Sequence, residues 1–309
     1  MSCENIATLW PDAEDEEDFD LVARDEEALG PGVRTLLDRL GVPGAPARFP
    51  TGSLPVYAIG DVVLKLYPPV HAEERPVEAG VLAAVHGRLP VPTPGVHASG
   101  EFEGWGYVLM DRLPGEPLSR AWPRLTDAER DGIAEQLGEG IAALHAVAPP
   151  AIEEWWPQDW DEFVADQVAG CAGRHRALGL APAWAAQIPD FLASVRLTAP
   201  AVLLHTEIMD EHLLVRDGRL TGLVDFEPAM RGAAEYDFVG PAVFLARGDT
   251  RVYGRMVRAY GIRPDADLRR RLMAWTLLHY YSNLPAFLER MPAPVEPTFD
   301  ALAERWFAM

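Results

Sequence analysis

The first third of the chain changes from helical to strand-like spacing of its apolar residues. Val33, Leu36 and Leu40 lie on one helical face, and Gly41 ends this pattern. Further along, short apolar runs are separated by turns, among them the hairpin dipeptide at residues 60–61. The elements predicted here are a helix over residues 31–41, strands over residues 62–67 and 106–110, and a helix over residues 77–86.

The remainder of the chain has mainly helical spacing. Thr126 and Glu129 have the spacing of a capping box, and the apolar stripe that follows ends at His145. Three short apolar runs interrupt the helices and favour strands. The predicted elements are strands over residues 202–204, 213–215 and 220–224 and helices over residues 250–260 and 268–288. A small sheet-rich part followed by a larger helical part indicates an α+β fold with two lobes.

Length and charge distribution refine this division. The chain has 309 residues, which exceeds what one small core needs and favours two lobes that share a cleft. Residues 1–30 carry eleven acidic residues and one arginine, so we expect a solvated or poorly ordered acidic arm. The expected organisation is this arm, an N-terminal lobe over residues 31–111 and a helical C-terminal lobe over residues 112–309.

Composition excludes several classes of protein. The net charge is −20, and no arginine run is long enough to form the basic stripe that a nucleic-acid partner requires. The two cysteines, Cys3 and Cys171, cannot build a disulfide framework. Neither a signal peptide nor a long apolar run is evident, so we expect a soluble cytoplasmic protein without a membrane partner, as a monomer or a dimer.

One residue stands out among the bases. Of the 27 Lys and Arg residues, a single one is lysine, Lys65, and it lies inside the predicted strand over residues 62–67. One interpretation is that this lysine is a chance survivor in an arginine-rich chain. The other is that its position needs a compact ammonium, which a planar guanidinium cannot replace.

A polar motif in the second half of the chain carries the candidate chemistry. The segment from His205 to His212 places Glu207 between two apolar runs, and the next run delivers Asp225, followed by Phe226, just past its end. This strand-loop-strand placement predicts that both acids reach one point of a cleft, as metal-nucleotide chemistry requires.

These motifs resemble those of the aminoglycoside phosphotransferase family, which shares the protein-kinase fold, and the hygromycin-type kinases are the most similar in pattern. The family's catalytic loop is His-Gly-Asp followed by four residues and Asn, and His205, Glu207 and His212 stand at its His, Asp and Asn places. Asp225 stands where the family has its metal-binding Asp. The resemblance extends in the right order over residues 45–250.

The resemblance implies ATP or GTP as phosphoryl donor and Mg²⁺, or alternatively Mn²⁺, as the metal. It implies that Lys65 holds the α- and β-phosphates and pairs with Glu78. Glu207 would act as base or hydroxyl orienter, with His205 anchoring the same loop. The other implied roles are metal binding by Asp225 and His212, phosphate covering by Gly52 and Ser53, and nucleotide contact in the lobe connection by Met110 and Arg112.

Two departures from the family pattern leave alternatives open. Glu207 is longer than Asp by one methylene, roughly 1.5 Å of reach, and such a displacement can cost about 100-fold in rate. His212 replaces an Asn, and an imidazole suits Mn²⁺ or Zn²⁺ better than Mg²⁺. One alternative is therefore a catalytically impaired, nucleotide-binding pseudokinase. The other is a metal-dependent oxygenase with a His-x-Glu…His set made of His205, Glu207 and His212.

The expected acceptor is a hydroxyl of a small cationic molecule, for instance an aminoglycoside. Residues 151–166 hold six carboxylates, three Trp and no basic residue, which suits charge pairing and stacking with a polycationic sugar. The alternative for this segment is an ordinary amphipathic helix with Trp160 and Phe163 in the core. Glu227 and Asp237 are also expected near the cleft, Asp237 as a brace for the loop.

Overall fold

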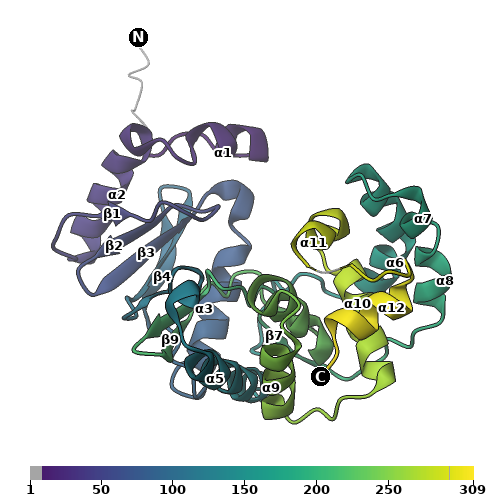
Figure 1. Cartoon of the computed structure of the whole chain (residues 1–309). Coiled ribbons are helices and arrows are strands. Elements are labelled where there is room, and N and C mark those ends of the chain that lie inside the picture. Colours follow the sequence, from purple (N-terminus) through teal and green to yellow (C-terminus); the bar gives the residue numbers. More distant parts are fainter. Residues whose placement is uncertain (1–8, 292) are drawn as a thin grey trace.

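The computed structural model describes residues 9–291 and 293–309, which form two lobes (Figure 1). The N-terminal lobe contains an antiparallel sheet of order β1-β2-β3-β5-β4. Its strands are β1 (Ala47–Arg48), β2 (Val56–Ile59), β3 (Val62–Tyr67), β4 (Val96–Phe102) and β5 (Trp105–Asp111). The predicted strand over residues 62–67 is confirmed, and residues 60–61 form its hairpin turn. Helix α3 (Glu74–Val85) packs against β4 and β5.

The acidic N-terminal segment is ordered where the structure describes it. Helix α1 (Glu16–Val22) and helix α2 (Glu26–Leu40) are each capped by an aspartate, Asp15 and Asp25, which places negative charge where the helix dipole favours it. The indole of Trp10 is 4% exposed and stacks on Trp105 of the sheet at 5.2 Å. Poor order is therefore wrong for residues 9–30, although most of their acidic side chains are exposed to solvent, and residues 1–8 lie outside the described part.

Helices dominate the C-terminal lobe. They are α4 (Leu118–Ala121), α5 (Asp127–His145), α6 (Trp160–Ala177), α7 (Pro182–Ala185), α8 (Ile188–Ala193), α9 (Thr250–Tyr260), α10 (Ala266–Leu278), α11 (Leu284–Arg290) and α12 (Phe299–Trp306), with short turns of helix at Trp122–Arg124, Ala234–Phe238 and Pro241–Ala246. One further short turn, Pro69–His71, precedes α3 in the N-terminal lobe. The capping box before α5 and the helix over residues 250–260 are confirmed. Among the described residues, no helix combines the length and the apolar character needed to cross a membrane.

The single helix predicted over residues 268–288 is wrong, because two helices occupy this range. Helix α10 ends at Leu278, and α11 begins after Asn283, whose side chain caps it. Pro285 lies in the first turn of α11, where its missing N–H costs nothing, whereas in a continuous helix it would remove a hydrogen bond. The segment between the helices is available to contact other parts of the lobe.

Two small sheets in the C-terminal lobe position the polar loops. Strand β7 (Ala201–Leu204) pairs antiparallel with β10 (Met230–Ala233), and β6 (Glu116–Pro117), β8 (Leu213–Arg216) and β9 (Arg219–Leu223) form a three-stranded sheet. The loop from β7 to β8 and the loop from β9 to β10 therefore lie side by side. The Val224 N–H donates to the His212 carbonyl at 3.0 Å, which joins the two loops directly.

Candidate active site

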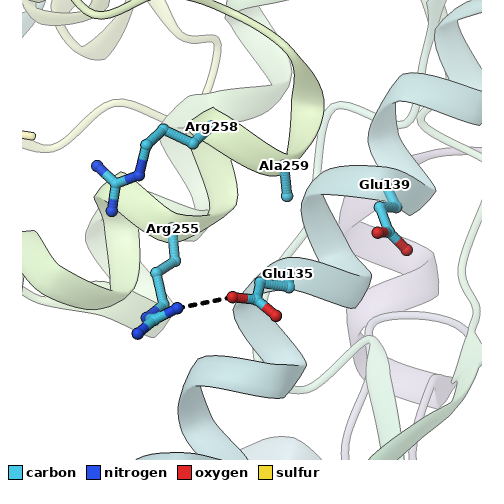
Figure 2. A pocket seen from close by; sticks show the side chains of 5 residues that line it. All are labelled: Glu135, Glu139, Arg255, Arg258 and Ala259. Carbon is cyan, nitrogen blue, oxygen red and sulfur yellow. Dashed lines mark hydrogen bonds and ion pairs between the residues drawn. The ribbon is translucent and has the colours of Figure 1, made fainter.

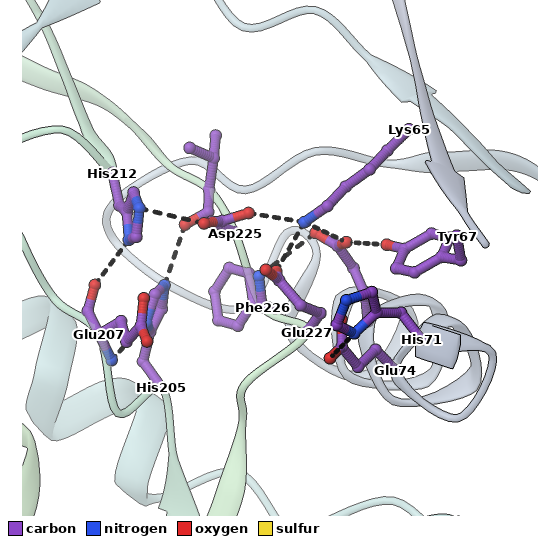
Figure 3. A network of polar contacts seen from close by, with 12 residues as sticks. Lys65, Tyr67, His71, Glu74, His205, Glu207, His212, Asp225, Phe226 and Glu227 are labelled. Atoms are coloured by element: carbon purple, nitrogen blue, oxygen red, sulfur yellow. Dashed lines mark hydrogen bonds and ion pairs between the residues drawn. The ribbon is translucent and has the colours of Figure 1, made fainter. Parts of the chain in front are cut away.

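Lys65 is the centre of a buried charge cluster between the lobes (Figure 3). Its ammonium lies 2.6 Å from Asp225 Oδ1, 2.6 Å from Glu227 Oε2 and 2.9 Å from Glu78 Oε2. The side chain is 4% exposed. Strand β3 supplies Lys65, helix α3 supplies Glu78, and the loop after β9 supplies the other two carboxylates. A lysine buried to this extent needs such partners, because an unpaired ammonium would lose its hydration without compensation.

Glu78 is the helix carboxylate that meets Lys65. The neighbouring Glu74 instead accepts a hydrogen bond from His71 at 2.9 Å, as Figure 3 also shows. The second oxygen of Glu78 accepts the Phe226 N–H at 3.2 Å, so this one carboxylate joins strand β3, helix α3 and the Asp225-Phe226 segment. A further hydrogen bond, from the Tyr67 hydroxyl, reaches the oxygen that contacts Lys65.

Glu227 is the residue whose role the sequence reasoning did not identify. It was expected near the cleft, but its ion pair with Lys65 was not predicted. Burial, and then the charge of Asp225, raises the pKa of Glu227 well above its usual range. Burial would likewise raise the pKa of Asp225, but the Lys65 ammonium, His212 and the hydrogen bonds from Glu227 and Lys65 together outweigh burial and lower that pKa. The two carboxyls thus share one ammonium, and their pKa values shift in opposite directions.

A second cluster adjoins the first through Asp225. Ligand atoms of Glu207, His212 and Asp225 all lie within 4.8 Å of one another. His212 Nε2 is 3.0 Å from Asp225 Oδ2, while its Nδ1 is 2.8 Å from the Glu207 carbonyl and donates to it. Asp225 has a φ of 77°, in the left-handed region that non-glycine residues rarely adopt. Such strain is retained where the surrounding structure determines the conformation, and it is common at functional sites.

The loop that carries Glu207 is anchored by a fully buried carboxylate. Asp237 accepts the His205 N–H at 2.9 Å, the Thr206 N–H at 2.6 Å and the Nε2–H of His145 at 3.0 Å. Thr206, at the place where the family pattern has glycine, has a φ of 70° and thus a left-handed backbone. Three donors on one carboxylate specify this conformation.

His205 is not part of the cluster of Glu207, His212 and Asp225. Its Nε2 donates to the Val224 carbonyl at 3.0 Å, and its Nδ1 accepts the Glu207 N–H at 3.3 Å. Because both ring nitrogens of His205 are already hydrogen-bonded to the backbone, the ring has no free lone pair for a metal. The oxygenase hypothesis, which needs His205, Glu207 and His212 as ligands, therefore loses one of its three residues.

The other predicted nucleotide contacts belong to three different parts of the N-terminal lobe. Gly52 and Ser53 are exposed in the loop between β1 and β2, and Gly52 has a φ of 111°. Met110 pairs with Val63, two positions from Lys65, and therefore shares its face of the sheet. The structure does not bring Arg112 to Lys65. Its guanidinium donates to the Gly60 carbonyl at the turn of the hairpin.

A pocket of about 290 Å³ lies between α5 and α9 and contains none of these residues (Figure 2). An ion pair of 2.7 Å between Arg255 and Glu135 crosses it. Charged side chains of both signs line this pocket, and the ion pair links α5 to α9.

The two-lobed fold and the lysine-centred cluster define a protein of the kinase-like phosphotransferase class. Residues 48–275 match the family described as "Phosphotransferase enzyme family". The chain belongs to this family, and it is therefore a kinase-type enzyme that transfers a phosphoryl group to a hydroxyl.

Solved structures show the same fold at low sequence identity. The GDP complex of wild-type aminoglycoside 2′-phosphotransferase-IIIa is 17% identical, with a TM-score of 0.66 over 92% of this chain and 98% of that chain. Macrolide 2′-phosphotransferase MphH from Brachybacterium faecium is 22% identical, with a TM-score of 0.59 over 86% and 99%. A thermostable mutant of aminoglycoside phosphotransferase APH(4)-Ia is 18% identical, with a TM-score of 0.60 over 89% and 96%.

Proposed function

We propose that this chain transfers the terminal phosphoryl group of ATP or GTP to a hydroxyl of a small cationic molecule. The observation that carries the proposal is the connection of two clusters through Asp225. One oxygen of Asp225 contacts Lys65, and the other contacts His212. A phosphate-binding ammonium, a metal-binding carboxylate and a carboxylate able to accept a proton, Glu207, are thus held in one place.

Each residue has a chemical role in this proposal. Lys65 would hold the α- and β-phosphates, and Glu78 would keep its ammonium in position. Bound metal would neutralise charge on the phosphates. Glu207 would orient the acceptor hydroxyl and take its proton. Burial raises the pKa of the Glu207 carboxyl, which makes its ionised form a stronger base than a solvated glutamate.

The cluster of Glu207, His212 and Asp225 fits a divalent cation. Because Nδ1 of His212 donates to a carbonyl, Nε2 is the ring nitrogen that would face a cation bound beside the Asp225 oxygen. Two acceptors at 3.0 Å repel unless a cation or a proton lies between them. One nitrogen ligand favours Mn²⁺ over Mg²⁺, so we propose Mn²⁺ as the better metal.

The test of transfer uses nucleotide with Mg²⁺ or Mn²⁺ and a panel of aminoglycosides, macrolides and simple amino sugars. Phosphorylated product is detected by mass spectrometry. Glu207→Gln is expected to lower the rate about 1,000-fold, since general bases contribute about 10² to 10⁴. Glu211→Gln is the matched control, because Glu211 is an exposed carboxylate of the same loop, and it should retain the rate. No transfer to any acceptor while nucleotide still raises the melting temperature would contradict the proposal.

The pseudokinase alternative has its own signature. It is favoured by the two loop substitutions at the family's Asp and Asn places, Glu207 and His212. If the chain is inactive, the double change Glu207→Asp, His212→Asn should create activity from none.

The metal assignment is tested separately by titrating Mn²⁺ into the nucleotide-free chain and recording its electron paramagnetic resonance. His212→Asn should weaken Mn²⁺ binding more than Mg²⁺ binding, and equal losses would contradict Mn²⁺ preference.

A further inference from the structure

Three large aromatic side chains form an exposed surface in the C-terminal lobe. Trp156, Tyr280 and Tyr281 are 50%, 47% and 63% exposed. Their rings meet edge to face, with centroids 5.0 Å apart for Trp156 and Tyr280 and 4.8 Å apart for the two tyrosines. The buried ring of Phe163 packs edge to face against Trp156, with the ring centroids 5.4 Å apart. We call these three residues the aromatic shelf. Contiguous exposed aromatic surface on a folded chain indicates a binding site.

The aromatic shelf is attached to the loop that carries Glu207. The Nε2–H of His279 donates to the Thr206 carbonyl at 3.1 Å, one residue before Glu207. The Nδ1 of the same ring accepts the Tyr281 N–H at 3.3 Å. The Tyr280 N–H donates to the hydroxyl of Tyr236, whose ring stacks on His279 at 4.5 Å. These contacts use the break between α10 and α11, and they hold the two tyrosines next to the loop that carries Glu207.

Several carboxylates act on Tyr281 of the aromatic shelf. Partial burial, and then the charge of Glu207, raises the pKa of the Tyr281 phenol, with further contributions from Glu74 and Glu227. Its ring is therefore neutral at physiological pH. Residues 151–166, which include Trp156, carry six carboxylates and no basic residue. A neutral π-face in a negative environment attracts a cation.

Trp155, the residue before Trp156, makes a cation–π contact within the chain. The guanidinium of Arg231 lies 5.5 Å from the ring centroid of Trp155. Trp155 is buried, whereas Trp156 points its indole to solvent. The buried indole of Trp155 therefore contacts a cation of the chain itself, whereas the exposed indole of Trp156 is accessible to a cationic ligand.

We propose that the aromatic shelf binds an alkylated ammonium group of the acceptor, that is, a tertiary or quaternary amine carried near the reacting hydroxyl. This inference rests on the proposed function and narrows its substrate class. A primary ammonium is compact and strongly hydrated, and it is best matched by carboxylates. An alkylated ammonium carries its charge on an apolar surface and binds aromatic faces. Three ring faces beside Glu207 therefore select N-alkylated amino sugars or amino alcohols over molecules bearing primary amines alone.

The test measures binding to the full chain by calorimetry, without nucleotide. The probes are two methyl glycosides of one amino sugar, identical except for a primary amine or a dimethylamino group. The dimethylamino glycoside is expected to bind about tenfold more tightly. Trp156→Ala and Tyr281→Ala should reduce this preference to about twofold or less, whereas Tyr281→Phe retains the ring and should retain the preference. Leu21→Ala, at a residue 76% exposed on α1, is the matched control.

Equal binding of the two glycosides by the unaltered chain would overturn the proposal. So would a full preference that persists in both alanine variants. Two separate positions are tested, so a fold defect in one variant leaves the other to decide. Because nucleotide is absent, these results concern the aromatic shelf alone. A chain that binds nucleotide and prefers the dimethylamino glycoside, yet phosphorylates no acceptor, would contradict the proposed function and leave the shelf as a binding site.

Discussion

The substitution Asp237→Asn is expected to impair catalysis without touching any group that holds nucleotide. Asp237 is fully buried, and its two oxygens accept hydrogen bonds from His205, Thr206 and His145. An asparagine of nearly the same shape keeps one of these oxygens. The amide NH₂ that replaces the other oxygen then faces a second donor, which is either a backbone N–H of the loop or the N–H of the His145 imidazole.

The loss of stability in Asp237→Asn follows from the hydrogen bonds that Asp237 accepts. Losing one hydrogen bond to a charged group costs about 1.5–3 kcal/mol, and a buried donor left without a partner adds about 1–3 kcal/mol. The free energy of unfolding should therefore fall by about 4 kcal/mol, which lowers the melting temperature by roughly 8 °C. A loop released from Asp237 also shifts Glu207, and a displacement of about 1 Å costs about 100-fold in kcat.

The assay compares kcat, nucleotide affinity and melting temperature in the same preparation. Nucleotide affinity should stay within about twofold, because Lys65 and Asp225 keep their own contacts. Glu235→Gln is a suitable control, since Glu235 is half-buried on the same helical turn but pairs with Arg271. If Asp237→Asn retains both kcat and the melting temperature, Asp237 does not anchor the loop and this reasoning is wrong.

Three further predictions concern stability. Lys65→Met leaves three carboxylates around an apolar side chain, so it should cost about 3–5 kcal/mol in chemical unfolding and abolish the thermal shift with nucleotide. Burial lowers the pKa of His279 from 6.5 to about 4, so the unfolded chain binds the extra proton. Unfolding free energy should fall below pH 6.5, by about 2 kcal/mol at pH 5, and an equally steep pH dependence in His279→Gln would refute this. In Gly232→Ala the new Cβ would lie 2.5 Å from the Trp160 ring, costing about 1–3 kcal/mol, whereas Gly173→Ala, which has nothing within 4 Å, should not destabilise the chain.

Local pattern was sufficient for elements whose ends are signalled nearby. The strand over residues 62–67 follows a turn dipeptide, and the helix over residues 250–260 ends at Gly261 in the left-handed conformation. Local pattern failed where a distant partner decides the structure. Trp10 is buried because Trp105 covers it, and no periodicity within the first thirty residues reveals that contact. Helix α10 ends where His279 turns to bond Thr206, although the apolar spacing continues.

By itself, the sequence determined the fold class, the single lysine, and the residue types that meet at the active site, because motif spacing and hydrophobic period act over a few residues. Only the tertiary structure decided how those residues are paired. It brought Glu227 to Lys65, turned His205 into the loop, and placed Asp225 between Lys65 and His212. The physical reason is that burial makes each charge demand a partner, and the partner comes from whichever loop the packed strands bring alongside.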